Sequence, residues 1–266
     1  MSYPRETVTI GEKKGRMTMI KAVLMDMDGT MFDTERLSTE GWLKAGRETG
    51  YEMTKEQIWD FRGRSRMENC ALFHSWFGPD APYWELREIR TKYLEDYLDE
   101  HGVPYKPGLR ELLVYLKEAG IRTCIATGTA REAASGYWAK CDVLNYVDAT
   151  LCGDQVVHAK PHPEMFLRAA ELLDTPPEEC LVLEDSPNGA TSAKAAGCHL
   201  VIIPDETPAT DEMRRQADHV VDTLFAVLSL FREGKFELGK QKRQGEQESV
   251  QGDGRLFFVD GMERPA

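Results

Sequence analysis

The chain has 266 residues, of which 41% are hydrophobic and 9% aromatic, as expected for a soluble globular protein with one large core and a smaller domain. A formal net charge of −12 argues against a broad nucleic-acid-binding surface, because phosphate backbones are bound by clustered lysine and arginine. No apolar run approaches the about 18 residues of a transmembrane helix, so no membrane span is expected. The six cysteines are scattered without a C-x-x-C pair, which favours reduced thiols and a cytoplasmic location.

Residues 1–18 are polar and charged and lack the apolar centre of a signal peptide, so we expect a flexible N-terminal extension. The first predicted strand is the apolar run Ala22–Met25, which ends on Asp26 and Asp28, followed by Gly29. Ligands of open α/β sheets bind at the carboxyl ends of the strands, so both acids are expected at one mouth. Two carboxylates that face one pocket repel, and a Mg²⁺ ion would relieve the repulsion. On these residues alone, an ordinary surface turn remains an alternative.

Residues 35–104 show apolar residues at helical spacing, such as Leu37, Trp42 and Ala45, without strand-like alternation. This range predicts a helical cap inserted into a core that residues 19–34 and 105–232 form. Within it, the segment Phe61–Arg66 holds three arginines around a glycine. Such a charge run is typical either of a solvated basic turn or of a loop that binds the anionic part of a ligand.

From Pro107 onward, predicted helices and strands alternate. In order they are a helix that begins at 109 and stops at Gly120, strand 121–126, helix 131–140, a short strand at 146–151, helix 164–173, strand 180–183, an alanine-rich helix opened by 186–189, strand 199–203 and helix 222–231. The alternation predicts an α/β fold with a doubly wound, Rossmann-like parallel sheet and an inserted α-helical cap. Residues 233–266 are polar and are expected to form a mobile tail, with 256–259 as a candidate late strand.

Polar residues end three of the predicted strands: Asp26 and Asp28, Thr127, and Glu184 with Asp185. Phosphoryl transfer needs a nucleophile, a proton carrier, a metal and donors for the phosphoryl oxygens. A carboxyl group has a pKa of about 4 in water, so Asp26 can attack phosphorus in its ionised form. Asp28, which stands beside other acids, can carry the proton of the leaving oxygen. The Thr127 hydroxyl and Lys160, which stands beside two prolines, would bind the phosphoryl oxygens, and Asp185 would complete the metal site.

Four motifs in order, DMDGT, ATGT, KPHPE and LEDSPNG, resemble those of the haloacid dehalogenase-like hydrolase superfamily. The resemblance covers about residues 20–231 and is to the branch with a helical cap, near β-phosphoglucomutase and the sugar- and nucleoside-phosphate phosphatases. It implies roles for seven positions. Asp26 would be the nucleophile that forms an aspartyl-phosphate, Asp28 the general acid/base, and Thr127, Gly128 and Lys160 the phosphate-binding residues. Asp26, Asp28 through its backbone carbonyl, and Asp185 would be Mg²⁺ ligands, and Glu184 a further ligand or the partner of one.

The resemblance also implies candidate substrate contacts at Arg62 and Arg66 in the cap and at Thr129 and Arg131 in the core. Arg131 stands near a position that helps hold the second phosphate in the mutases. Ser38 occupies the position where the β-phosphoglucomutase group has a cap histidine.

We therefore expect a Mg²⁺-dependent phosphatase that acts on a small phosphorylated metabolite, a sugar or nucleoside monophosphate. A phosphomutase of the β-phosphoglucomutase type is the alternative at the same site. A non-catalytic binding or regulatory protein on the same fold is the alternative of another class. The protein is expected to be a monomer or weak homodimer that binds neither nucleic acid nor membranes.

Overall fold

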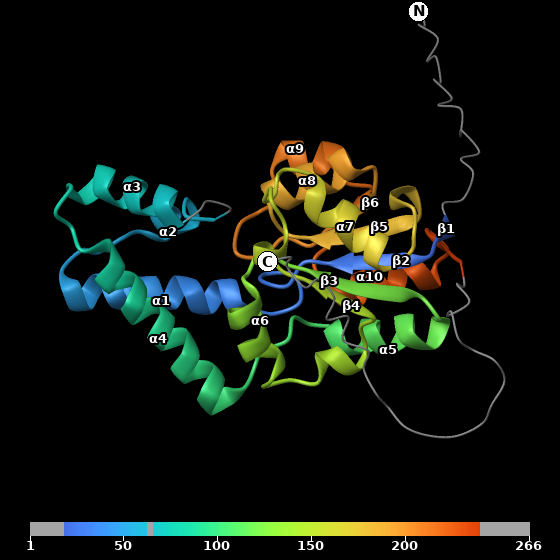
Figure 1. Cartoon of the computed structure of the whole chain (residues 1–266), viewed down its shortest axis with the longest axis horizontal. Coiled ribbons are helices and arrows are strands. Elements are labelled where there is room, and N and C mark those ends of the chain that lie inside the picture. The colour runs from blue at the N-terminus through green and yellow to red at the C-terminus, as the bar shows by residue number, and fades with distance from the viewer. Residues whose placement is uncertain (1–18, 63–65, 240–266) are drawn as a thin grey trace, which may run out of the picture.

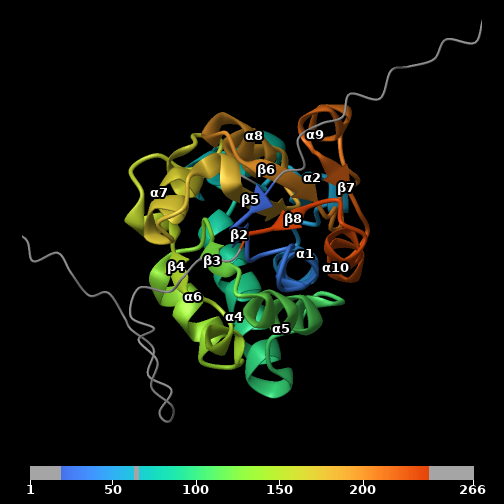
Figure 2. The same ribbon diagram turned by 90° about the vertical axis from the view of Figure 1, so that its right-hand side faces the viewer.

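The computed structural model describes residues 19–62 and 66–239. Within these ranges, six parallel strands form the main sheet in the order β4-β3-β2-β5-β6-β7 (Figure 1 and Figure 2). They are β2 (Ala22–Met25), β3 (Arg122–Ala126), β4 (Ala149–Leu151), β5 (Cys180–Glu184), β6 (His199–Ile202) and β7 (His219–Val220). The central strand β2 pairs in parallel with β3 on one side and β5 on the other. The predicted parallel α/β sheet is confirmed.

Helices cover both faces of the sheet (Figure 2). One face packs against α5 (Leu109–Ala119), α6 (Arg131–Trp138) and α10 (Leu224–Arg232), and the other against α7 (Glu164–Leu172), α8 (Pro187–Ala196) and α9 (Asp211–Gln216). The short 3₁₀ helices are η1 (Val143–Asn145), η2 (Gly153–Gln155) and η3 (Pro177–Glu179).

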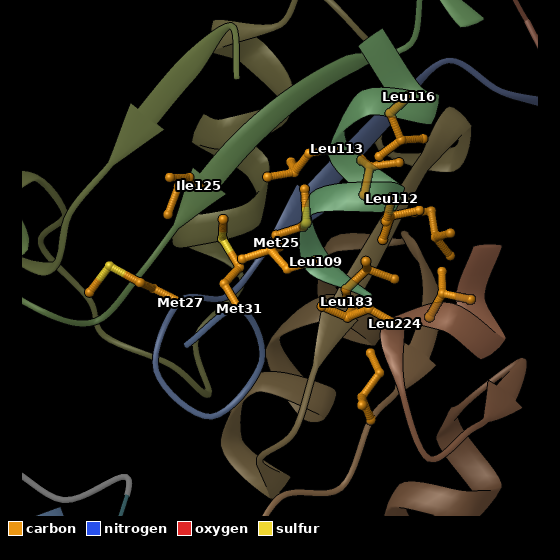
Figure 3. Packing of buried hydrophobic residues seen from close by; sticks show 14 of the residues in the cluster. Met25, Met27, Met31, Leu109, Leu112, Leu113, Leu116, Ile125, Leu183 and Leu224 are labelled. Atoms are coloured by element: carbon orange, nitrogen blue, oxygen red, sulfur yellow. The ribbon is translucent and has the colours of Figure 1, made fainter. Parts of the chain in front are cut away.

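All residues of β2 are fully buried, and they alternate between the two cores. Val23 and Met25 face the core that includes the leucines of α5, which Figure 3 shows packed around Met25. Ala22 and Leu24 face the core formed with α7 and α8. A strand covered on both faces reads as a continuous apolar run, and this is why Ala22–Met25 stands out in the sequence.

The inserted helices lie between β2 and α5 in the sequence and beside the sheet in space (Figure 1). They are α1 (Thr34–Thr49), α2 (Lys55–Trp59), α3 (Arg66–Phe77) and α4 (Tyr83–His101). They bury an aromatic core of their own, in which the ring centroids of Trp42 lie 5.1 Å from Phe61 and 5.7 Å from Tyr83. The side chain of Thr54 begins α2 with a capping box. A separate core of this kind keeps the inserted helices together away from the sheet.

The chain differs from the predicted pattern at its two ends. The short strands β1 (Met19–Ile20) and β8 (Glu237–Leu238) pair in parallel, and the amide of Gly239 donates to the carbonyl of Ile20 at 2.8 Å. Residues 236–239 thus belong to the folded core although they fall in the expected mobile tail. The physical reason is Phe236, which is buried against Phe231 and anchors a stretch whose average composition is polar. Strand 256–259 and residues 1–18 lie outside the described residues.

Two further elements, α9 and β7, escaped the sequence prediction because they are short. Among the described residues, every helix falls short of the length or the apolar character that crossing a bilayer requires.

Candidate active site

The turn after β2 brings Asp26 near Asp185, an acid that is far from it in the sequence. The amide of Asp26 donates to the carbonyl of Leu183 at 3.0 Å, which extends the pairing with β5 by one residue. The chain then reverses at Gly29, whose φ is +83°. A Cβ atom there would lie 2.4 Å from Asp185 Oδ2, so the turn needs glycine both for its backbone angle and for this close approach. As a result, Thr30 Oγ1 donates to Asp185 Oδ1 at 3.2 Å.

A buried lysine forms the floor of this site. Lys160, in the loop between η2 and α7, donates from Nζ to Asp26 Oδ1 at 2.6 Å and to Glu184 Oε1 at 2.8 Å. Its third acceptor is the carbonyl of Ala126 at the end of β3, at 3.2 Å. Burial alone would lower the pKa of Lys160, but the charges of Asp26 and Glu184 outweigh it and raise the pKa. The lysine therefore stays charged and joins the ends of three strands.

Glu184 is engaged on both oxygens. While Oε1 accepts from Lys160, Oε2 accepts from the amides of Asp185 and Ser186 at 2.8 Å each and from the Ser186 hydroxyl at 2.9 Å. A Cβ atom on Gly189 in the first turn of α8 would overlap the carboxyl group, so this glycine makes room for it. These contacts direct Glu184 toward Lys160 and the start of α8. The Asp185 carboxylate instead lies beside the turn at Gly29, at the edge of the sheet where the strands end.

Asp28 is oriented by two hydroxyl groups. Thr34, the first residue of α1, donates to Asp28 Oδ1, and Thr129 donates to Oδ2, both at 2.6 Å. The predicted substrate residue Thr129 thus contacts Asp28, and its amide donates to Thr127 Oγ1 at 3.0 Å. Thr34 was not singled out from the sequence, although it follows Asp28 by only six positions.

The oxygen donors at the mouth fit a magnesium ion. Asp26 and Asp185 are 8% exposed each, and burial raises the pKa of both, with Glu184 adding to the rise. Within residues 19–62 and 66–239, no basic side chain forms an ion pair with Asp185. The same ranges contain no group of three His, Cys, Asp or Glu side chains arranged to hold a metal. Mg²⁺ usually takes only one or two protein carboxylates and fills its shell with water and phosphate oxygens, so the Asp26 and Asp185 carboxylates with the Asp28 backbone carbonyl would suffice.

A cleft of about 950 Å³ leads from Asp28, Gly128 and Thr129 toward α4. It adjoins a smaller cavity of about 260 Å³ between the inserted helices, and both are lined by Arg66, Arg87 and Arg90, with Glu35. Burial and the charges of Arg66 and Arg90 lower the pKa of Arg87, so the three guanidinium groups lie close enough to repel one another. Arg90 donates to Ser38 Oγ from Nη2 at 2.6 Å and from Nε at 3.0 Å. Arg66 thus lines the cleft, and its role as a substrate contact stays a prediction, whereas Arg64 lies outside the described residues.

The other two arginines named from the sequence are engaged by protein groups. Arg62 Nη2 lies 2.7 Å from Glu206 Oε2, and its Nε lies 3.3 Å from Glu35 Oε2. The guanidinium of Arg131 donates to Thr150 Oγ1 at 2.7 Å and to Gln155 Oε1 at 2.6 Å, and stacks 5.3 Å from the Trp138 ring centroid. It is directed toward β4 and η2 and lines neither cavity.

Sequence reasoning missed Arg87, Arg90 and Glu206. On α4 the two arginines look like an ordinary charged helix face. Their spacing of three residues, which puts both on one side of a helix, is the only signal that the sequence offers. Glu206 stands in a loop after a strand, and nothing in its neighbourhood distinguishes it from other acids.

Comparison with known proteins agrees with this architecture. A family model described as haloacid dehalogenase-like hydrolase matches residues 20–197. CbbY of Rhodobacter capsulatus is 32% identical over 73% of this chain and 89% of its own length. The phosphorylated carbohydrates phosphatase of Thermotoga maritima is 30% identical over 67% of this chain and 82% of its own length. The crystal structure of CbbY from Rhodobacter sphaeroides with xylulose-(1,5)bisphosphate has a TM-score of 0.64 at 26% identity and covers 77% of this chain and 95% of CbbY.

The chain belongs to the haloacid dehalogenase-like hydrolase family. The predicted membership is confirmed, and the prediction of a hydrolase of the phosphatase type agrees with the names of its relatives.

Proposed function

We propose that this protein is a Mg²⁺-dependent phosphatase that hydrolyses a small phosphorylated metabolite through an aspartyl-phosphate on Asp26. The observation that carries the proposal is the buried Lys160, which joins Asp26 to Glu184 while Asp185 stands beside the turn at Gly29. A charged amine next to a carboxylate at the carboxyl edge of a parallel sheet offers a nucleophile and a positive charge for phosphoryl oxygens in one place.

In the first step, an oxygen of Asp26 attacks phosphorus and the bond to the leaving alcohol breaks. Asp28 gives its proton to the leaving oxygen, and the hydroxyl groups of Thr34 and Thr129 hold the Asp28 carboxyl group in place. In the second step, Asp28 takes a proton from the water that attacks the aspartyl-phosphate, which releases inorganic phosphate and restores Asp26. The Thr127 hydroxyl and Lys160 bind the phosphoryl oxygens, and the close approach of η2 to Gly128 fixes the loop that carries this hydroxyl.

Mg²⁺, when bound by the Asp26 and Asp185 carboxylates and the Asp28 backbone carbonyl, would offset the negative charge of the mouth and polarise the phosphoryl oxygens. Both oxygens of Glu184 are occupied by donors, so we assign it the role of partner to Lys160 and Asp185 rather than of direct ligand.

The smaller cavity of about 260 Å³, lined by Arg66, Arg87 and Arg90 and called the arginine cavity below, indicates the class of substrate. Arg66, Arg87 and Arg90 lie where the part of the substrate remote from the reacting phosphate would extend. The residues that line this smaller cavity include four arginines and one acid, Glu35, so an anionic group of the substrate would offset the excess positive charge. The substrate is therefore a phosphorylated metabolite with a second anionic group, such as a sugar bisphosphate. The bisphosphate bound in the CbbY crystal structure supports this choice over a sugar or nucleoside monophosphate with a neutral leaving group.

A panel of phosphorylated metabolites tests the function. With Mg²⁺ present, release of inorganic phosphate is expected, fastest from sugar bisphosphates. Conversion of a hexose 1-phosphate to its 6-phosphate isomer without free phosphate would instead support the phosphomutase. Absence of both reactions across the panel would support the non-catalytic binding protein.

The protein's environment and assembly are part of the proposal. The six cysteines are unpaired, and five of them are buried, which suits a reducing compartment such as the cytoplasm. We propose a monomer or weak homodimer, which sedimentation velocity over a range of concentrations would test.

A further inference from the structure

The loop between β6 and α9 reaches from the catalytic core to the inserted helices. It leaves β6 next to the end of β5, where the amide of Ile203 donates to the carbonyl of Glu184 at 2.8 Å. The loop therefore starts at the same edge of the sheet as the acids of the active site. Asp205 and Glu206 follow within three residues.

A single oxygen of Glu206 accepts from three side chains of the inserted helices. The donors to Oε2 are Thr39 Oγ1 of α1 at 2.6 Å, Arg62 Nη2 just after α2 at 2.7 Å and Trp59 Nε1 of α2 at 3.3 Å. The side chains of Glu206 and Arg62 are 16% and 18% exposed, so this ion pair is largely shielded from water. A carboxylate with three donors, one of them charged, is a strong contact, and its loss leaves three donors without their acceptor.

The neighbouring acid fixes the base of the loop. Asp205 lies 2.5 Å from Lys106 Nζ, and its side chain is 4% exposed. Lys106 stands in the connection between α4 and α5, and its amide donates to the carbonyl of Met31 at 2.9 Å. Asp205 therefore holds the connection through which the chain returns to the core, and Glu206 beside it contacts the inserted helices themselves.

The contact continues toward the catalytic acid. Arg62 also pairs with Glu35, and the preceding residue, Thr34, donates to Asp28. Arg62 lines the arginine cavity, and its Nη1 has no hydrogen-bond partner within the described ranges. The place of this guanidinium in the wall of the cavity thus depends on the two carboxylates that hold it, one from α1 and one from the core.

We propose that Glu206 is a positioning residue that holds the inserted helices closed over the active site and fixes Arg62 in the cavity wall. The proposal rests on the proposed function in one respect: a substrate must enter and leave between the core and these helices, so the contact breaks and re-forms in each turnover. Arg62, which the sequence marks as a substrate contact, serves here to join the two parts of the protein.

The variant Glu206→Gln tests this inference, because glutamine keeps the shape and the acceptor for Thr39 and Trp59 but removes the charge that holds Arg62. The matched control is Glu212→Gln on α9, an exposed acid that pairs with Arg215 of its own helix. Hydrogen exchange followed by mass spectrometry reports on closure without any substrate. We expect amides of α2 and of the first turns of α1 to exchange several-fold faster in Glu206→Gln than in wild type or the control.

Kinetics provide the second measurement. For a sugar bisphosphate, Glu206→Gln is expected to lower kcat/KM about tenfold, the change that loss of one charged contact produces. For p-nitrophenyl phosphate, which carries no second anionic group for the arginine cavity, a smaller loss of kcat/KM is expected, because only the effect on closure remains. The double variant with Arg62→Met should lose little more than either single variant, since both changes remove the same contact.

Unchanged exchange in α1 and α2 of a folded Glu206→Gln protein would overturn the inference, as would an equal effect in Glu212→Gln. If the wild-type protein released no phosphate from any substrate, the proposed function would fail, and the exchange measurement would still decide the role of Glu206.

Discussion

Lys160 Nζ lies 2.6 Å from Asp26 Oδ1, although the two residues are 134 positions apart in the chain. Both side chains are about nine-tenths buried, and the ion pair sits where β2, β3 and β5 end side by side. One cation thus serves two carboxylates, Asp26 and Glu184. In the free protein, the Lys160 ammonium group forms ion pairs with both carboxylates. A bound metal ion and phosphoryl group would compete for these contacts.

The first prediction concerns the loss of this cation. Lys160→Met leaves two buried carboxylates without their partner, and it should lower the free energy of unfolding by about 3–5 kcal/mol. Turnover should fall by about 10²-fold or more, since a donor to the phosphoryl oxygens is lost. Urea denaturation and phosphate release measure the two effects. Lys21→Met, which breaks the partly exposed pair with Glu179, is the control and should cost no more than about 1 kcal/mol. Similar stability losses in both variants would contradict the assignment.

The second prediction separates orientation of the general acid from substrate binding. Thr129→Val keeps the size of the side chain but removes the hydroxyl group that donates to Asp28. We expect kcat to fall about tenfold with KM nearly unchanged, because the interaction orients the proton carrier rather than the substrate. Steady-state kinetics on the best substrate provide the measurement. A rise in KM with kcat preserved would mean that Thr129 binds substrate directly.

The third prediction links pH, metal and stability. Burial raises the pKa of Asp26 to about 8 and that of Asp185 above its usual range, whereas unfolded carboxyl groups have a pKa of about 4. The folded state thus holds these protons more tightly, so their contribution to stability is largest below about pH 4 and is lost as pH rises toward about 8.

Mg²⁺ competes with protons for the same oxygens, so its stabilising effect should grow with pH. At about 100 times its Kd, the ion is expected to raise Tm by about 5–10 °C at pH 8 and by clearly less at pH 5. Differential scanning calorimetry with Mg²⁺ or with a chelator gives both values. An increase in Tm that is the same at both pH values, or absent, would argue against a magnesium site formed by these acids.

The fourth prediction concerns the arginine cavity. Arg87→Gln should raise KM for a sugar bisphosphate about 30-fold, because the second anionic group loses a buried charged partner. For a monophosphate of the same sugar, KM should change less than about threefold. Arg215→Gln, on the exposed face of α9, removes the same charge elsewhere and serves as the control. Equal effects on both substrates would mean that the cavity does not bind a second anionic group of the substrate.

The sequence predicts the central part of the site well, because strand ends can be located from short apolar runs that stop at polar residues. Asp26, Thr127 and Asp185 each follow such a run, and parallel strands end at one edge of a sheet. Lys160 is different. Its loop shows no periodicity, and only the motif around it indicated a role. The structure brings it to the acids through the loop that precedes α7.

Contacts between the core and the inserted helices could not be predicted. The pairing of Glu206 with Arg62 joins residues 144 positions apart, and neither residue type is distinctive in a chain with 45 acidic and 33 basic residues. Phe236 shows the same limit at the end of the core, where one aromatic residue outweighs the polar composition around it. In both cases, the contact depends on which surfaces pack together after the strands and helices have formed, and a local sequence pattern does not show this.

The most direct measurement is a rapid-quench experiment with a substrate carrying ³²P in the transferred phosphoryl group, followed by peptide mapping. In the wild-type protein, label is expected on the peptide that contains Asp26, and Asp26→Asn is expected to show neither label nor turnover. Ordinary phosphate release by Asp26→Asn, or label on a different residue, would contradict it.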